Sequence, residues 1–180
     1  NNGGDPPSGD DITDGNGTVL AEYDDSPGGE EIDKLIDNDE NTKYLTFHSN
    51  AWIEYQHTEA VIVDGYGITS ANDSPQRDPS SWEFQGWDVS ASNWVTLHSI
   101  ADEPEWPSRF HQKTFSFSNS AAYSRYRVAV SAVNGADIMQ MAELEIYRKV
   151  APPSTNDITD LGGSIRGSND FLPWTGVESD

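Results

Sequence analysis

Residues 34–47, KLIDNDENTKYLTF, carry a cluster of oxygen-bearing side chains in a short loop, among them Asp37, Asp39, Asn41 and Thr42. Three kinds of chemistry use such a group. A hard cation takes six to eight oxygen ligands, a solvated turn holds its acids by local hydrogen bonds, and a catalytic cleft uses paired carboxylates. The residue types alone leave all three open.

An EF-hand is excluded by the spacing. Asp37, Asp39 and Asn41 occupy positions 1, 3 and 5 of such a loop. The EF-hand also needs Gly at position 6 and a bidentate Glu at position 12. Thr42 and His48 stand there instead. A different calcium site and an empty, hydrogen-bonded acidic turn remain as alternatives.

Catalytic motifs are weak in this chain. The sequence has no Gly-x-Ser-x-Gly, and its four histidines, at positions 48, 57, 98 and 111, do not show a metal-ligand spacing. The abundant acids mean that counting cannot exclude a glycosidase-like carboxylate pair. Most of these acids fall in linkers and turns, where solvation is their ordinary role. We therefore favour binding over catalysis.

The composition narrows the class of partner. The 180 residues include 31 acidic and 10 basic side chains, for a formal net charge of −21. This charge repels nucleic acid and anionic lipid, and no apolar run is long enough for membrane insertion. Cysteine is absent, which excludes disulfides and thiolate metal sites. A bound divalent cation is another way to staple such a domain.

The elements that must position these residues are short strands. Apolar or alternating runs rich in β-branched and aromatic residues are bounded by Gly, Pro, Asn, Asp or Ser, which favours strands. These runs cover residues 51–56, 60–69, 81–90, 93–100, 113–119, 124–133 and 142–150. Residues 29–37 could form a short helical turn. The pattern predicts an all-β antiparallel sandwich or jelly roll.

The two ends of the chain resemble each other. PPSGDDITDGNGTV begins at Pro6 and PPSTNDITDLGGSI begins at Pro152, an offset of 146 residues. We interpret this as an internal repeat of one whole domain; two similar low-complexity linkers are the alternative. The expected organisation is a linker over 1–17, one module over 18–150, and a linker with the start of a second module over 151–180.

The order of these pieces resembles the discoidin, or coagulation-factor type C, domain, and most closely the bacterial family 32 carbohydrate-binding modules. Four stretches carry the resemblance: 34–47, 51–56, 68–99 and 123–147. The resemblance implies a discoidin-like jelly roll. The chain departs from the family in lacking the Cys pair of human-type members and in having Asn38 where Gly usually follows the loop Asp.

The resemblance also implies a structural Ca²⁺ that ties the early loop to the last strand. Its oxygens would be the carbonyls of Lys34, Asp39, Thr42 and Ala142, the Thr42 hydroxyl, and the carboxylates of Asp37 and Glu143. Two carboxylates among neutral oxygens suit Ca²⁺ better than Zn²⁺, which prefers His or Cys.

Two proline-bounded loops, 70–82 and 101–112, supply the polar and aromatic groups that a sugar needs. The candidate ligand-binding residues are His48, Asn72, Asp73, Arg77, Asp78, Trp106, Arg109 and Phe110. His48 and Arg77 match the family's usual His and Arg. We expect Trp106 to be exposed and residues 134–140 to form a rim, whereas Trp82, Trp87 and Trp94 are expected in core or hairpin packing. An Arg77–Asp78 ion pair is the alternative for those two residues.

Two functions fit these features. The first is a non-catalytic module that tethers a secreted, multimodular polysaccharide-degrading enzyme, a glycoside hydrolase or polysaccharide lyase, to its glycan. The second is an adhesion or cell-surface interaction domain in a tandem array. Either implies a secreted or cell-surface bacterial protein with covalently linked neighbouring modules. The chain's acidity favours neutral sugar units as ligands.

Overall fold

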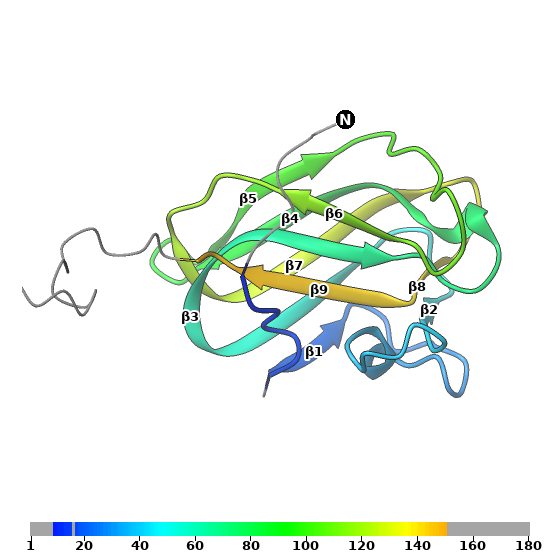
Figure 1. The fold of residues 1–180 in the computed structure, drawn as a ribbon, viewed down its shortest axis with the longest axis horizontal. Coiled ribbons are helices and arrows are strands. Elements are labelled where there is room, and N and C mark those ends of the chain that lie inside the picture. Colours follow the sequence, from blue (N-terminus) through cyan, green and yellow to red (C-terminus); the bar gives the residue numbers. More distant parts are fainter. Residues whose placement is uncertain (1–8, 16, 151–180) are drawn as a thin grey trace, which may run out of the picture. The chain divides into compact units, whose positions relative to one another are not determined.

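The computed structural model describes residues 9–15 and 17–150, and these form an antiparallel β-sandwich (Figure 1). The strands are β1 (Thr18–Ala21), β2 (Tyr44–Thr46), β3 (Ala51–Thr69), β4 (Pro79–Asp88), β5 (Asn93–Ile100), β6 (Gln112–Ser116), β7 (Ala122–Val133), β8 (Met139–Met141) and β9 (Glu143–Arg148). Two 3-10 turns, η1 (Ile32–Leu35) and η2 (Pro75–Arg77), interrupt them. The all-β prediction is confirmed, and the expected helical turn is η1.

Strand β3 joins the two layers of the sandwich. Its first part pairs with β1 and β7, in the layer ordered β1-β3-β7-β4-β5. Its last part pairs with β6 and β9 in the other layer. The register shift between Gln56 and Val61 marks the bulge that separates the two parts. A small ribbon, β2 paired with β8, closes one end.

Aromatic rings fill the space between the layers. Tyr66 stacks on Phe84 with ring centroids 4.4 Å apart, and Trp82 Nε1 donates a hydrogen bond of 2.8 Å to the Tyr66 hydroxyl. Aliphatic side chains such as Ile53 and Val128 complete the core. Each aromatic side chain buries a large apolar area. The chain can therefore form a core although only 34% of its residues are hydrophobic. In the described part of the chain, no helix is long and apolar enough to cross a membrane.

The prediction of a linker over 1–17 is wrong for Asp10–Thr13, which we call the N-terminal clasp. Ile12 is only 4% exposed, and its N–H donates to the Ile146 carbonyl at 2.8 Å. The Asp11 carboxylate accepts the Ile146 N–H at 3.0 Å, and the Tyr55 hydroxyl donates to the Ile12 carbonyl. Ile12 is the only large apolar side chain of the clasp. It is enough to hold the segment against β9 because the clasp backbone and Asp11 also complete the hydrogen bonding of that strand. The expected second-module start, 151–180, lies outside the described residues.

Candidate functional site

Oxygen atoms converge in the loop that follows η1. The Thr42 hydroxyl lies 3.0 Å from both carboxylate oxygens of Asp37, 3.0 Å from the Asp39 carbonyl and 3.5 Å from the Lys34 carbonyl. A hydroxyl has a single proton to donate. Other donors also reach these oxygens: Lys34 Nζ lies 3.5 Å from the Asp37 carboxylate, and the Thr42 N–H donates to the Asp39 carbonyl at 2.9 Å. The oxygens still converge on one small region, an arrangement that a hard cation fits.

Local backbone geometry forms this loop. The Asp37 carboxylate accepts the Asp39 N–H at 3.0 Å, and the Asp39 carboxylate accepts the Asn41 N–H at 3.0 Å. Asn38 has a φ of 60°, in the left-handed region that Gly and Asn tolerate best. Asn38 therefore adopts without a glycine a backbone conformation that most residues avoid.

Glu143, at the start of β9, faces this loop from the other layer. Its side chain is 5% exposed, and within the described residues its Oε1 atom is buried without a hydrogen-bond partner. Burial, followed by the negative charge of Asp37, raises the pKa of the Glu143 carboxyl to about 8. Two acidic groups held together in this way call for a proton or a cation between them.

The donor set at this loop fits a hard cation and no other common metal. Among the described residues, no group of three or more His, Cys, Asp or Glu could hold a metal ion. A metal here would depend on Asp37, Glu143 and neutral oxygens, which suits Ca²⁺ and not Zn²⁺. Phe110, 39% exposed, lines a hollow of about 470 Å³ beside this loop together with Asp39 and Glu143.

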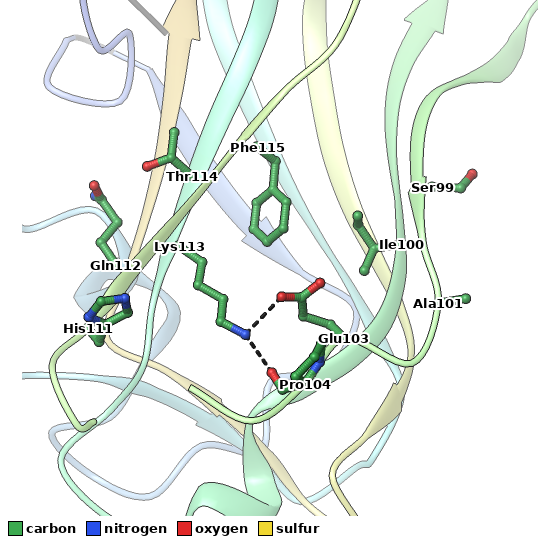
Figure 2. A pocket seen from close by; sticks show the side chains of 10 residues that line it. All are labelled: Ser99, Ile100, Ala101, Glu103, Pro104, His111, Gln112, Lys113, Thr114 and Phe115. Atoms are coloured by element: carbon green, nitrogen blue, oxygen red, sulfur yellow. Dashed lines mark hydrogen bonds and ion pairs between the residues drawn. The ribbon is translucent and has the colours of Figure 1, made fainter. Parts of the chain in front are cut away.

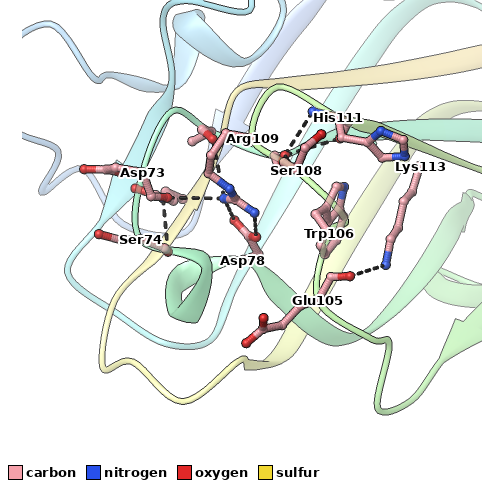
Figure 3. A network of polar contacts seen from close by, with 12 residues as sticks. Asp73, Ser74, Asp78, Glu105, Trp106, Ser108, Arg109, His111 and Lys113 are labelled. Carbon is pink, nitrogen blue, oxygen red and sulfur yellow. Dashed lines mark hydrogen bonds and ion pairs between the residues drawn. The ribbon is translucent and has the colours of Figure 1, made fainter.

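Asp78 and Arg109, two predicted ligand residues, bind each other. The guanidinium forms a bidentate ion pair with the fully buried carboxylate, at 2.9 and 2.6 Å (Figure 3). Burial raises the pKa of Asp78, and the hydrogen bonds and charge of Arg109 oppose that rise. Arg109 also donates to the Asp73 carbonyl at 3.2 Å. The pair therefore joins the two proline-bounded loops, and Arg77 is not the partner of Asp78.

Trp106 was expected to be exposed, and this expectation is wrong. The ring is 5% exposed and its Nε1 donates to the Ile68 carbonyl at 3.3 Å. It lies 6.5 Å from the buried Trp82 ring, and Lys113 Nζ lies 4.4 Å from its centroid. The prolines on either side turn this loop back over the sandwich, so Trp106 extends the core and is not a wall for a sugar.

A cavity of about 750 Å³ opens between β5 and β6, the outer strands of the two layers (Figure 2). Lys113 crosses it and pairs with Glu103 at 2.8 Å. The Pro104 carbonyl also accepts from Lys113. None of the predicted ligand residues lines this cavity.

Lys43 organises the loop that carries Asn72 and Asp73. It is 8% exposed, and its Nζ donates to Asn72 Oδ1 and Asp73 Oδ1 at 3.0 Å each, and to Gln140 Oε1 at 3.1 Å. Sequence reasoning missed this residue. Its only local signal was the Thr-Lys pair in the resembling stretch, which does not reveal partners up to 97 residues away.

His48 and Arg77 lie on segments that flank the same loop. The Ala136 N–H donates to the Gln76 carbonyl at 3.0 Å, which fixes the loop after β7 beside η2. The β2–β8 ribbon ends at the Thr46–Met139 pair, so residues 47–50 continue toward that loop. We call segments 47–50, 72–77 and 134–138 the loop end (Figure 1).

Two polar groups are presented at the loop end. The His48 ring stacks on Tyr23, with centroids 3.6 Å apart, and its Nε2 lies 3.3 Å from Asp25. The partly exposed Arg77 guanidinium makes no ion pair with any residue that the structure describes. Burial acts to raise the pKa of Asp73, but Lys43 and Gln140, and after them the charge of Arg77, lower that pKa overall. A fixed imidazole and a guanidinium outside any ion pair among the described residues can serve as hydrogen-bonding groups for a polar ligand.

Comparison with solved structures shows the fold. A family 32 carbohydrate-binding module from Clostridium perfringens in complex with GalNAc-β-1,3-galactose aligns over 77% of this chain and 99% of its own, with TM-score 0.61 and 17% identity. The family 32 module of Streptococcus pneumoniae EndoD covers 78% and 100%, with TM-score 0.64 and 14% identity. An F5/8 type C domain from Bacteroides fragilis covers 75% and 93%, with TM-score 0.63 and 15% identity.

Sequence comparison is less informative. No family model matches this chain. An Arabidopsis thaliana peptide-N(4)-(N-acetyl-β-glucosaminyl)asparagine amidase is 26% identical over 140 residues, covering 73% of this chain. The chain spans about a fifth of that relative, 19% of its length. The discoidin-like fold expected from the sequence is confirmed by the solved structures.

Proposed function

We propose that this chain is a non-catalytic carbohydrate-binding module that tethers a secreted, multimodular polysaccharide-degrading enzyme to its glycan. The observation that carries the proposal is the loop end, where Arg77 has no ion-pair partner among the described residues and His48 is fixed by Tyr23 and Asp25. The solved modules of this fold support it, since two of them are complexes with GalNAc-β-1,3-galactose and with galactose.

The loop end suits a shallow, polar ligand. Its acceptors at Asn72 and Asp73 are pre-positioned by the buried Lys43, so little ordering entropy is lost on binding. Arg77 offers donors in a rigid fork that can bind two neighbouring hydroxyls. With a net charge of −21 on the chain, a neutral sugar is favoured over a uronate.

We also propose a structural Ca²⁺ in the oxygen-rich loop. Its ligands would be Asp37 and Glu143 with oxygens of Lys34, Asp39, Thr42 and Ala142. When bound, the ion would supply the positive charge that offsets the two carboxylates. The crowded oxygens around the Thr42 hydroxyl and the unpaired Glu143 oxygen support this assignment. The ion would connect η1 to β9 and would not contact the sugar.

Residues 151–180 are proposed to be a linker and the start of a second module of a secreted or cell-surface bacterial protein. The motif Asp-Ile-Thr-Asp at 157–160 repeats residues 11–14. In the described module this motif includes most of the N-terminal clasp, with Ile12 buried against β9. The motif at residues 11–14 therefore has a structural role in the described module. This supports the interpretation of its second copy as the start of another module over that of a low-complexity linker.

The test is a glycan array on the full chain, followed by calorimetry of Arg77→Ala against the glycan that binds best. Loss of a hydrogen-bonding partner of this kind costs about 1–3 kcal/mol, so we expect the affinity to fall at least about tenfold. Arg148→Ala, an exposed arginine at the far end of β9, is the matched control and should bind as the wild type does. Unchanged affinity in a folded Arg77→Ala variant would move the site elsewhere.

A further inference from the structure

The five-stranded layer has a second face, turned away from the core. Side chains alternate along a strand, and Ile53, Phe84 and Val128 point inward. Their neighbours therefore point outward and form what we call the outer face: Trp52, Glu54 and Gln56 on β3, Arg125 and Arg127 on β7, Glu83, Gln85 and Trp87 on β4, and Trp94 and Thr96 on β5. Three of the six tryptophans lie here.

This face is not an ordinary solvated surface. Glu54 is only 4% exposed and Gln85 only 8%, although both point away from the core. Large side chains cover them. The Arg127 guanidinium carbon lies 4.3 Å from the Trp94 ring centroid, and that of Arg125 lies 4.8 Å from the Trp87 ring. Across the β4–β5 hairpin, Trp87 and Trp94 pack edge to face at 5.3 Å.

Hydrogen bonds fix the polar groups of the outer face in place. Arg125 holds Glu54 with two bonds, at 2.6 and 3.0 Å. Gln85 accepts from Arg127 Nε at 2.5 Å and donates to Glu83 at 2.6 Å. Register pairs Glu54 with Arg127, and Arg127 with Gln85, across β3, β7 and β4. The row is therefore ordered before any ligand arrives, which lowers the entropy cost of binding.

Arg127 is the group that this network leaves incomplete. Among the described residues it makes no ion pair, and only its Nε atom has an acceptor. Burial lowers the pKa of this guanidinium. Arg127 also lines a hollow of about 140 Å³ together with Glu22, Tyr23 and Trp52. Free donors of Arg127, a carboxylate acceptor and aromatic rings thus meet at one place on the face.

We propose that the outer face is a second glycan-binding site, which takes a neutral oligosaccharide chain laid across β3, β7, β4 and β5. Tryptophan rings would pack on the C–H faces of the sugars, while Arg127, Gln85 and Glu83 would bind their hydroxyls. Four strands spaced about 4.8 Å apart span about 14 Å, enough for roughly three linked sugars. The site adjoins the loop end, because Asn50 and Tyr23 also line the hollow beside Arg127 and Tyr23 stacks on His48. Arg127 and the Trp87–Trp94 pair belong to the outer face alone.

Charge selects a neutral chain over an acidic one. The outer face and its hollow carry the carboxylates of Glu22, Glu54 and Glu83 against the two guanidinium groups of Arg125 and Arg127. This balance is nearly even, in a chain whose net charge is −21. A polyanion would be repelled by the protein as a whole, whereas sugar hydroxyls can both donate to the carboxylates and accept from Arg127.

The test is calorimetry of the full chain with four neutral hexaoses: cellohexaose, laminarihexaose, chitohexaose and β-1,4-galactohexaose. We expect at least one to bind about tenfold or more tightly than its monosaccharide, because only a chain reaches across the strands. Arg127→Ala and Trp94→Ala should each weaken that binding at least about tenfold. Binding of none of the four hexaoses, or tighter binding of hexagalacturonate, overturns the proposal.

Two further variants keep the result interpretable. Val89→Ala lies at the tip of the β4–β5 hairpin, 75% exposed, and should bind hexaose as the wild type does. If Trp94→Ala fails to fold, Arg127→Lys serves in its place, because lysine retains the charge but not the fork. A folded Arg127→Lys or Arg127→Ala protein with wild-type hexaose affinity contradicts the proposal. Failure of the loop end would appear separately, as monosaccharide binding that Arg77→Ala does not change.

Discussion

Asp78 and Glu143 are both buried carboxylates near one end of the sandwich, yet their surroundings differ. Asp78 has no exposed surface and receives two hydrogen bonds from Arg109. Glu143 is 5% exposed, has one oxygen without a partner among the described residues, and faces the carboxylate of Asp37. The chain supplies a cation to the first carboxylate and a second anion to the other.

This difference separates a carboxylate that the protein itself neutralises from one that needs a proton or, as we propose, a cation. A buried charge is tolerated only when it is paired and hydrogen-bonded. Asp78 meets that condition with protein atoms alone, so its contribution to stability should not depend on metal. Glu143 meets it only by binding a proton or a cation. If the cation is Ca²⁺, the stability of the folded module should rise when calcium is added and fall when it is removed.

The largest expected effect is at Asp78. Asp78→Ala leaves Arg109 half-buried without its partner, and breaking a buried pair in this way costs about 3–5 kcal/mol. Urea denaturation should show this loss with calcium and with chelator alike. Asp137→Ala, an exposed acid on the neighbouring loop, is the control and should stay near the wild type. A loss below about 1 kcal/mol would mean that the pair is not structural.

The second prediction removes the proposed ion from the wild type. An ion that binds only the folded chain stabilises it by about 2.7 kcal/mol when its free concentration is 100 times its Kd. For a domain of this size we expect chelator to lower Tm by about 5–10 °C. Elemental analysis of the purified chain should find one Ca²⁺ per module. An unchanged melting curve together with absent calcium would make Glu143 merely a protonated acid.

Glu143→Gln should change stability less than calcium removal does, and it should not destabilise the protein in chelator. The amide is a weaker calcium ligand, so the added stability from calcium should shrink. In chelator, however, the neutral amide does not repel Asp37, and the variant should be as stable as the wild type in chelator or up to about 1 kcal/mol more stable. Thermal melts of both proteins with and without chelator measure this. A variant that is clearly weaker than the wild type in chelator would show that the two carboxylates do not oppose each other.

How far the sequence could predict these sites depends on the distance between partners. The oxygen-rich loop was visible because Asp37, Asp39 and Thr42 are close in sequence. The strands were visible because their alternation is local, and the resemblance supplied their arrangement. The pairing of Asp78 with Arg109, 31 residues later, was not visible. Neither was the position of Lys43, because a pattern of residue types does not state which long side chain reaches which loop.

The predictions for Trp106 and for the N-terminal clasp were wrong for a related reason. A tryptophan between prolines in a polar loop suggested exposure, but the loop packs back over Trp82. A Gly-, Pro- and Asp-rich terminus suggested a linker, but Asp11 and Ile12 complete the hydrogen bonding of β9. The composition of a segment indicates how much apolar surface it can bury. It does not indicate which backbone N–H and C=O groups elsewhere in the fold need a hydrogen-bond partner.

The smallest expected effect tests whether the described module holds every partner of both carboxylates. Asp78 is bonded by Arg109, and Glu143 faces residues of the loop after η1, so neither needs a residue beyond Val150. Deleting residues 152–180 should therefore change Tm by less than about 1 °C, with or without chelator. Deleting residues 1–13 is the contrasting variant. It removes the clasp, exposes the edge of β9, and should lower Tm by several degrees. A tail deletion that destabilises the module would imply that Asp157–Thr159 shares the clasp position with Asp11–Thr13, and the repeat would then act within one module and not begin another.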